Sequence, residues 1–218
     1  DEVGPGDLAV IAGFPTVGVA STIDNDLNGF DTTIGVDTAL NTALEMIDRL
    51  RDTASSHHRA FVVEVMGRNS GYLALMTGLA SGAEIILTPE IPYPIERVPD
   101  VLHAAYARGK THFIVVAAEG SPVKAAEVVE RLNKEKGRYE ARLSVLGHVQ
   151  RGGSPLVFDR LLATRSAAAA VDALISGQSG VVAGLARGRI SLVPTAEAIQ
   201  PCTKVPREMI ELAETLAR

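Results

Sequence analysis

Residues 61–82 read FVVEVMGRNSGYLALMTGLASG, and this stretch decides the fold class. The unbroken apolar run Phe61–Val65 is typical of a strand that is buried on both faces. A glycine-containing turn follows, and Tyr72–Ser81 then has the small and apolar residues of a packed helix, which Gly82 ends. A strand that leads directly into a helix is the repeating unit of α/β proteins.

The same alternation continues on both sides of this stretch. Further strands are expected at 15–20, 84–87, 113–117 and 143–146, and a late hairpin at 181–183 and 190–193. Further helices are expected at 36–51, 95–108, 122–136, 158–175 and 207–217. The sequence therefore predicts an α/β protein with mostly parallel sheets.

The net charge and the composition of the chain limit the kinds of molecule that it is expected to bind. The net charge is -5 and no basic block is present, so nucleic acid and anionic membrane are not expected as partners. No apolar run is long enough to span a membrane and no signal peptide is visible, which predicts a cytoplasmic location. Cys202 is the single cysteine, so an internal disulfide is excluded.

Polar or glycine-rich clusters follow four of the five expected parallel strands. They are Thr22–Asp26, Met66–Arg68, Glu119–Gly120 and Gly147–His148. In open α/β sheets, ligands bind outside the carboxyl ends of the strands. The spacing therefore predicts a ligand site built from these clusters.

Two kinds of chemistry are consistent with these residues. The loop Thr22–Asp26 holds two carboxylates, which suit either a simple turn or proton abstraction and metal binding. An arginine fork matches the geometry of a phosphate, although most arginines only cover a surface. The candidate phosphate ligands are Arg59, Arg68, Arg142, His148 and Arg151.

Taken together, the motifs resemble the phosphofructokinase family and occur in the family's order. They are Thr22–Asp26, Thr33–Leu40, Arg51–His57, Val63–Arg68, Ala118–Gly120 and Leu146–Pro155. The resemblance runs from about Gly13 to the end of the chain. It implies two three-layer α/β domains of phosphofructokinase type, and transfer of a phosphoryl group from ATP to the 1-hydroxyl of fructose 6-phosphate in glycolysis.

The resemblance also implies roles for single residues. Asp24 is expected to be the base, with Thr22 and Asp26 beside the transferred phosphoryl group and Mg²⁺, and Arg68 in contact with sugar and phosphoryl group. The other implied substrate contacts are Ile23, Met66, Gly67, Glu119, Val149 and Gln150. The implied clamp on the 6-phosphate is Arg59, Arg142, His148 and Arg151.

An oligomer and a regulatory site are implied as well. Arg59 and Arg142 are expected to reach the site of a neighbouring subunit, in a homotetramer built from dimers. A nucleotide effector between subunits is implied at Arg51, Gly82, Ala83, Glu84, Arg108, Lys110, Thr111 and His112. The alternative for these eight residues is a set of surface charges at helix ends.

Two departures from the family pattern qualify these expectations. The Gly-Gly-Asp nucleotide loop, with the main Mg²⁺ ligands, does not precede Thr22, and the chain begins at Asp1 without Met. We therefore expect a chain truncated at its amino terminus and inactive alone. Its first domain, 1–35 plus 150–200 on the nucleotide side, would be incomplete. Residues 36–149 plus 201–218 would form the sugar-phosphate domain.

The second departure concerns the phosphoryl donor. Ser21 is small and neutral, whereas pyrophosphate-dependent members usually have lysine before the threonine, so ATP is the favoured donor. A pyrophosphate-dependent phosphofructokinase remains the first alternative. A non-catalytic sugar-phosphate-binding or regulatory subunit is the alternative from another class.

Overall fold

The computed structural model describes residues 14–57, 59–134, 140–202 and 205–216. The chain divides into two compact units. Unit 1 comprises residues 1–38 and 154–202, and unit 2 comprises residues 39–153 and 203–218. Each unit is built around its own sheet.

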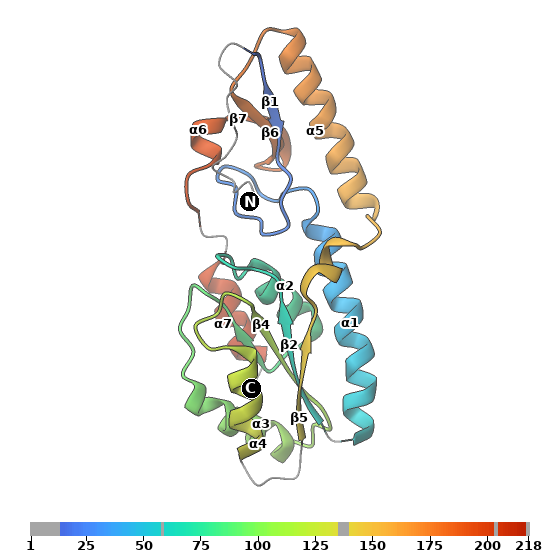
Figure 1. Cartoon of the computed structure of the whole chain (residues 1–218), viewed down its shortest axis with the longest axis vertical. Coiled ribbons are helices and arrows are strands. Elements are labelled where there is room, and N and C mark those ends of the chain that lie inside the picture. The colour runs from blue at the N-terminus through green and yellow to red at the C-terminus, as the bar shows by residue number, and fades with distance from the viewer. Residues whose placement is uncertain (1–13, 58, 135–139, 203–204, 217–218) are drawn as a thin grey trace. The chain divides into compact units, whose positions relative to one another are not determined.

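The sheet of unit 1 has the strand order β1-β6-β7. Strand β1 (Val17–Val19) runs parallel to β6 (Val181–Ala186), and β6 pairs in antiparallel register with β7 (Arg189–Pro194). The predicted late hairpin is thus confirmed. The long helix α5 (Val157–Ile175) packs along this sheet, and the short helix α6 (Thr195–Ala198) follows β7 (Figure 1).

The loop that follows β1 is fastened to this sheet. Phe30 is buried against β6, where a Cβ atom added to Gly184 would lie 2.7 Å from the Phe30 ring. The amide of Asp31 donates to the carbonyl of Leu185 at 2.8 Å, and the amide of Asn28 donates to that of Ala198 at 2.9 Å. The hairpin and α6 therefore form the support on which this loop lies.

Unit 2 contains a four-stranded sheet in the order β3-β4-β2-β5, and every neighbouring pair is parallel. The strands are β3 (Ile85–Leu87), β4 (Phe113–Ala118), β2 (Arg59–Val65) and β5 (Glu140–Val145). All residues of β4 are buried. The predicted parallel α/β arrangement is confirmed.

Helices cover both faces of the sheet of unit 2 (Figure 1). They are α1 (Val36–His57), α2 (Tyr72–Ser81), α3 (Val98–Ala107), α4 (Ala125–Lys134) and α7 (Arg207–Leu216). Helix α3 packs against α4, and α2 packs against α7. None of the helices in the described ranges is long and apolar enough to cross a membrane.

Several predicted boundaries are wrong, each for a local reason. Strand β5 begins at Glu140 instead of Leu143, because this edge strand exposes most of its side chains and has no continuous apolar run. The helix expected from residue 95 starts as a 3-10 turn, η1 (Ile95–Arg97), before α3. Helix α1 continues past residue 51, and the short elements α6 and η2 (Gly147–Arg151) were not expected.

Candidate active site

The candidate residues belong to both units. The loop Thr22–Asp26 is part of unit 1, whereas the candidate phosphate and sugar ligands from Arg59 to Arg151 belong to unit 2. The two sets are therefore described in turn.

A buried turn at Asn25 shapes the loop after β1. Asn25 is fully buried and has a φ of 53°, a left-handed conformation that asparagine tolerates better than most residues. Its Nδ2 donates to the carbonyl of Asp31 at 3.3 Å. The Thr33 hydroxyl donates to the carbonyl of Thr22 at 2.5 Å and lies 3.4 Å from the Asn25 Oδ1. The chain reversal between Asp24 and Asp26 is thus held from inside the unit.

The two carboxylates of this loop have different surroundings. Both are half-buried, and the amide of Asp24 donates to Thr22 Oγ1 at 3.2 Å. The Oδ1 of Asp26 is buried and accepts no hydrogen bond from the described residues, which is costly for a carboxylate oxygen that has no other partner. Cys202 Sγ donates to the backbone carbonyl of Asp26 at 3.1 Å.

The Oδ1 of Asp26 fits a role as a ligand of a hard cation. Mg²⁺ typically takes one or two carboxylates and completes its shell with water and substrate phosphates. Within the described ranges, no three His, Cys, Asp or Glu side chains are grouped so that they alone hold a metal ion. The buried Oδ1 of Asp26 is thus the atom of this loop that fits such a carboxylate ligand.

In unit 2, the ends of β2 and β4 meet tightly. The Glu119 amide donates to the carbonyl of Val65 at 2.9 Å, and the Gly120 amide donates to that of Gly67 at 3.1 Å. A Cβ atom added to Gly120 would lie only 1.8 Å from the carbonyl oxygen of Arg68. Glycine at 120 therefore permits the two loops to touch, which sets the position of the exposed Arg68.

The turn η2 joins the same edge of the sheet from β5. Gln150 is 1% exposed, and its Oε1 accepts a 2.7 Å hydrogen bond from the amide of the buried Met66. His148, Val149 and Arg151 of the same turn are exposed. Unit 2 thus brings the segments after β2, β4 and β5 together, with basic side chains on the outside.

Two of the predicted phosphate ligands lie elsewhere in unit 2. Arg59 opens β2, seven positions before Met66, so roughly 20 Å of extended strand separates them. Arg142 faces Phe61, in the register of β5 on β2, near the same end. Both pair with Glu140, at 3.3 Å from Arg59 Nε and 2.5 Å from Arg142 Nη2. Within unit 2 they are remote from the Met66 edge.

The predicted effector residues include a buried ion pair. The Glu84 side chain is 1% exposed, and its Oε1 pairs with Lys110 Nζ at 2.5 Å. Its Oε2 accepts a 2.7 Å hydrogen bond from the amide of Ile114. Arg51 donates to the carbonyl of Ser81, while its Nε is buried without a hydrogen bond to the described residues. In this cluster Lys110 is thus the partner of the buried Glu84. Arg51 instead binds the Ser81 carbonyl and lies 3.9 Å from the Asp48 carboxylate.

His112 belongs to the same cluster. Burial lowers the pKa of His112 below the ordinary value of 6.5, and the neighbouring Arg51 and Lys110 lower it further. The Glu84 carboxylate acts in the opposite direction and raises this pKa. The neutral imidazole is therefore favoured at neutral pH.

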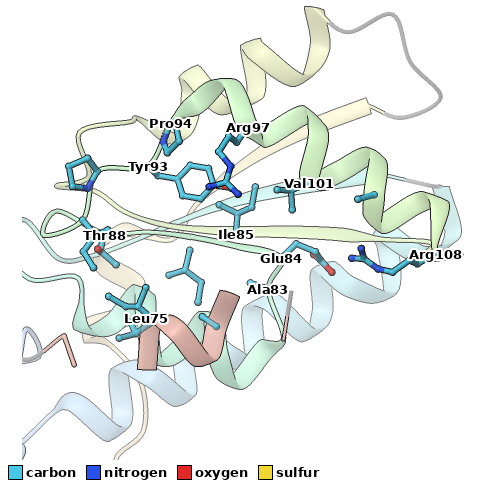
Figure 2. A pocket seen from close by; sticks show the side chains of 16 residues that line it. Leu75, Ala83, Glu84, Ile85, Thr88, Tyr93, Pro94, Arg97, Val101 and Arg108 are labelled. Atoms are coloured by element: carbon cyan, nitrogen blue, oxygen red, sulfur yellow. The ribbon is translucent and has the colours of Figure 1, made fainter. Parts of the chain in front are cut away.

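A cavity of about 330 Å³ adjoins this cluster. It shares Ala83, Glu84 and Arg108 with the predicted effector residues, and Tyr93 and Arg97 line its other end (Figure 2). Ile210 and Ala213 of α7 also line it. The cavity was not anticipated from the sequence.

Two further residues that hold parts of the candidate site, Asp159 and Glu140, were not identified from the sequence. Asp159 is buried and accepts hydrogen bonds from Gly35 and Thr38 at the start of α1. The one available signal was Gly35 itself, since a helix that begins after a glycine has no side chain to cap its first amides. Glu140, which pairs with both Arg59 and Arg142, gave no signal in the sequence.

Comparisons with known proteins agree on one family. The family model described as phosphofructokinase matches residues 6–174. The chain is 52% identical over 206 residues to ATP-dependent 6-phosphofructokinase 1 of Thermus thermophilus. It is 48% identical over 205 residues to the ATP-dependent 6-phosphofructokinase of Brevibacillus brevis. Each match covers 94% of this chain, and the chain spans 64% of the length of these relatives.

Solved structures give the same fold. The phosphofructokinase of Saccharomyces cerevisiae superimposes with a TM-score of 0.81 at 34% identity, over 93% of this chain and 27% of that one. The pyrophosphate-dependent phosphofructokinase of Marinobacter aquaeolei gives 0.76 at 25% identity, over 89% of this chain and 55% of that one.

Proposed function

The chain belongs to the phosphofructokinase family, and we propose that it carries the base and the sugar-phosphate ligands of an ATP-dependent 6-phosphofructokinase. The observation that carries the proposal is the loop Thr22–Asp26, in which the buried Asn25 turn holds two carboxylates after β1. The relatives named ATP-dependent 6-phosphofructokinase support ATP as the donor.

In this proposal Asp24 accepts the proton of the 1-hydroxyl of fructose 6-phosphate. The freed oxygen forms a bond to the γ-phosphorus of ATP as the bond from that phosphorus to the ADP oxygen breaks, which yields fructose 1,6-bisphosphate and ADP. Phosphoryl transfer depends mainly on positioning and on offsetting charge. Arg68 offsets charge on the moving phosphoryl group, and Thr22 and Ile23 line its path.

Asp26 is the residue of this chain that would hold Mg²⁺, because its buried Oδ1 has no other partner among the described residues. When bound, Mg²⁺ supplies positive charge to the phosphates of ATP. Unit 1 is then the nucleotide-side domain and unit 2 the sugar-phosphate domain.

The sugar phosphate is recognised at the Met66 edge of unit 2. Met66, Gly67 and Glu119 contact the sugar, while the exposed His148 and Arg151 bind the 6-phosphate. Val149 completes the substrate contacts of this turn, and the buried Gln150 supports it through the bond to Met66. Arg59 lies roughly 20 Å from this edge and Arg142, in register with Phe61, about 16 Å from it, which supports their action on the 6-phosphate of a neighbouring subunit. The functional assembly is then a homo-oligomer, proposed as a tetramer.

An anionic effector is proposed at the cluster of Arg51, Glu84, Lys110 and His112. The buried Nε of Arg51 lacks a partner among the described residues, and Arg108 lines the adjoining cavity. Gly82, Ala83, Arg108 and Thr111 complete the proposed site. A negatively charged ligand supplies an acceptor for the Arg51 guanidinium.

The test is a donor comparison in the complete natural protein that carries this sequence. It is incubated with fructose 6-phosphate and either Mg-ATP or pyrophosphate, and fructose 1,6-bisphosphate is measured. We expect rapid turnover with Mg-ATP. Faster turnover with pyrophosphate establishes the pyrophosphate-dependent alternative. The structural similarity to the pyrophosphate-dependent enzyme of Marinobacter aquaeolei is the reason for testing this donor. Sugar-phosphate binding without turnover with either donor establishes the binding-subunit alternative.

A further inference from the structure

We propose that Asp159 is a positioning residue for Asp24, which holds the junction between the loop after β1 and helix α1 in the geometry that proton abstraction requires. This inference rests on the proposed function of Asp24. Asp159 itself is remote in sequence and is buried, so it acts through the residues that it binds.

The first step is the set of hydrogen bonds to Asp159, which is 2% exposed. Its Oδ1 accepts from the amide of Gly35 at 2.9 Å. Its Oδ2 accepts from the amide of Thr38 at 2.9 Å and from the Thr38 hydroxyl at 2.5 Å. Both oxygens are thus engaged by the first turn of α1, where amides lack partners within the helix and a negative charge is favourable.

The second step leads from Gly35 to the loop. Gly35 has a φ of 100°, and a Cβ atom added to it would lie 3.2 Å from Cγ2 of Ile23. The amide of Ile34 donates to the carbonyl of Ala20 at 2.9 Å, and Thr33 holds the carbonyl of Thr22. Residues 33–35 therefore lie directly against residues 20–23.

The consequence concerns the residue next to Ile23. Asp159 fixes Gly35, Gly35 lies against Ile23, and Ile23 precedes Asp24 in the chain. Loss of the Asp159 contacts therefore permits the base to shift. A displacement of about 1 Å at a reacting group is enough to reduce a rate by roughly 100-fold. A residue that only capped α1 would change stability without this selective effect on turnover.

The main variant is Asp159→Asn, which keeps the shape of the side chain but cannot accept at both positions. We expect kcat for fructose 6-phosphate to fall by roughly 10- to 100-fold, while its KM changes by less than about threefold, because the proposed sugar-phosphate ligands belong to unit 2. The matched control is Asp172→Asn, an exposed position on the same helix α5, for which we expect wild-type values.

A second readout does not depend on activity. Backbone amide hydrogen exchange is measured in residues 20–26 and, for comparison, in β2 and β4. In Asp159→Asn, exchange is expected to accelerate in residues 20–26 and to stay unchanged in the two strands. If Asp159→Asn does not fold, the pair Thr38→Val and Thr38→Ser replaces it. Only the serine variant keeps the hydroxyl bond to Asp159, so it restores the slow exchange and the kcat that the valine variant loses.

Opposite results overturn the inference. They are unchanged exchange in residues 20–26 in a folded Asp159→Asn protein, an unchanged kcat, or equal behaviour of the two Thr38 variants. Failure of the proposed function is seen separately, in wild-type protein that does not turn over fructose 6-phosphate. In that case the exchange experiment still decides whether Asp159 holds the loop.

Discussion

The side-chain carbonyl of Gln150 accepts a 2.7 Å hydrogen bond from the backbone amide of Met66, two residues 84 positions apart in the chain. This bond ties the turn η2 to the end of β2. It links the segment that carries His148 and Arg151 to the segment that carries Arg68. In the proposed enzyme, Gln150 thus sets the distance between the 6-phosphate ligands and the sugar contacts.

Replacement of this buried side chain is the first test. Gln150→Met keeps a similar volume but leaves the amide of Met66 without its acceptor, so we expect the free energy of unfolding to fall by about 1–3 kcal/mol. Urea denaturation measures the change. The exposed Gln178→Met is the control and is expected to stay within about 0.5 kcal/mol of wild type. Equal stability of the two variants contradicts a structural role for the Gln150 bond.

A second prediction concerns the close approach of Gly120 to Arg68. In Gly120→Ala, the new Cβ would lie 1.8 Å from the Arg68 carbonyl oxygen and 2.9 Å from that of Gly67, so the backbone must move. We expect kcat/KM for fructose 6-phosphate to fall by roughly 100-fold, because Arg68 is displaced. Steady-state kinetics measure the change.

The stability comparison for this variant is Gly152→Ala. A Cβ atom there meets only the Val149 carbonyl, at the ordinary contact distance of 3.7 Å. Thermal unfolding is expected to show a loss for Gly120→Ala and little change for Gly152→Ala. A Gly120→Ala protein with unaltered kinetics shows that the Arg68 loop tolerates the shift.

The fold was largely predictable because its central strands can be recognised in the sequence as continuous apolar runs. Phe113–Ala118 and Phe61–Val65 are continuous apolar runs, since a central parallel strand is buried on both faces. Strand β5 was misplaced because it lies at the sheet edge and follows no such rule. In α1 the small side chains of Ala39 and Ala43 are fully buried, whereas the larger Leu40 is only half-buried.

The candidate site was predictable only in part. The polar clusters at Met66–Arg68, Glu119 and Gly147–Arg151 were found because parallel strands end at one edge. The partners Asp159 and Glu140 were not found. Asp159 binds the Gly35 amide 124 positions away, and Glu140 pairs with Arg59 from another strand of the sheet, so no local pattern encodes which acceptor meets which donor.

A third prediction concerns the titration of His112. Because burial lowers its pKa below 6.5, the imidazole proton measured by NMR is expected to titrate below that pH. The unfolded chain then binds more protons than the folded chain just below pH 6.5, so stability falls as the pH drops through this range. His112→Asn is expected to show a smaller loss of stability between about pH 7 and pH 5.

The neighbours of His112 supply the controls. Glu84→Gln removes the group that raises the pKa, so the His112 midpoint is expected to fall further. Inorganic phosphate, used as a probe of the proposed effector site, is expected to raise the midpoint, because a bound anion favours the imidazolium. If His112 in the phosphate-free wild type has its titration midpoint at or above pH 6.5, burial and the neighbouring cations do not outweigh the effect of Glu84 on its pKa.

The last prediction tests the base itself. Asp24→Asn preserves the size of the side chain and the Asn25 turn but removes the group that takes the proton, so kcat is expected to fall by roughly 100- to 10,000-fold. Binding of fructose 6-phosphate, measured by calorimetry, is expected to change little, since its proposed phosphate ligands lie on η2 in unit 2. Asp31→Asn is the control. Asp31 is exposed, and the asparagine in the variant still has a side-chain oxygen that can accept the hydrogen bond from the Gly188 amide. Near-normal turnover in Asp24→Asn assigns proton abstraction to another group, whereas a parallel loss of binding indicates that Asp24 holds the sugar as well.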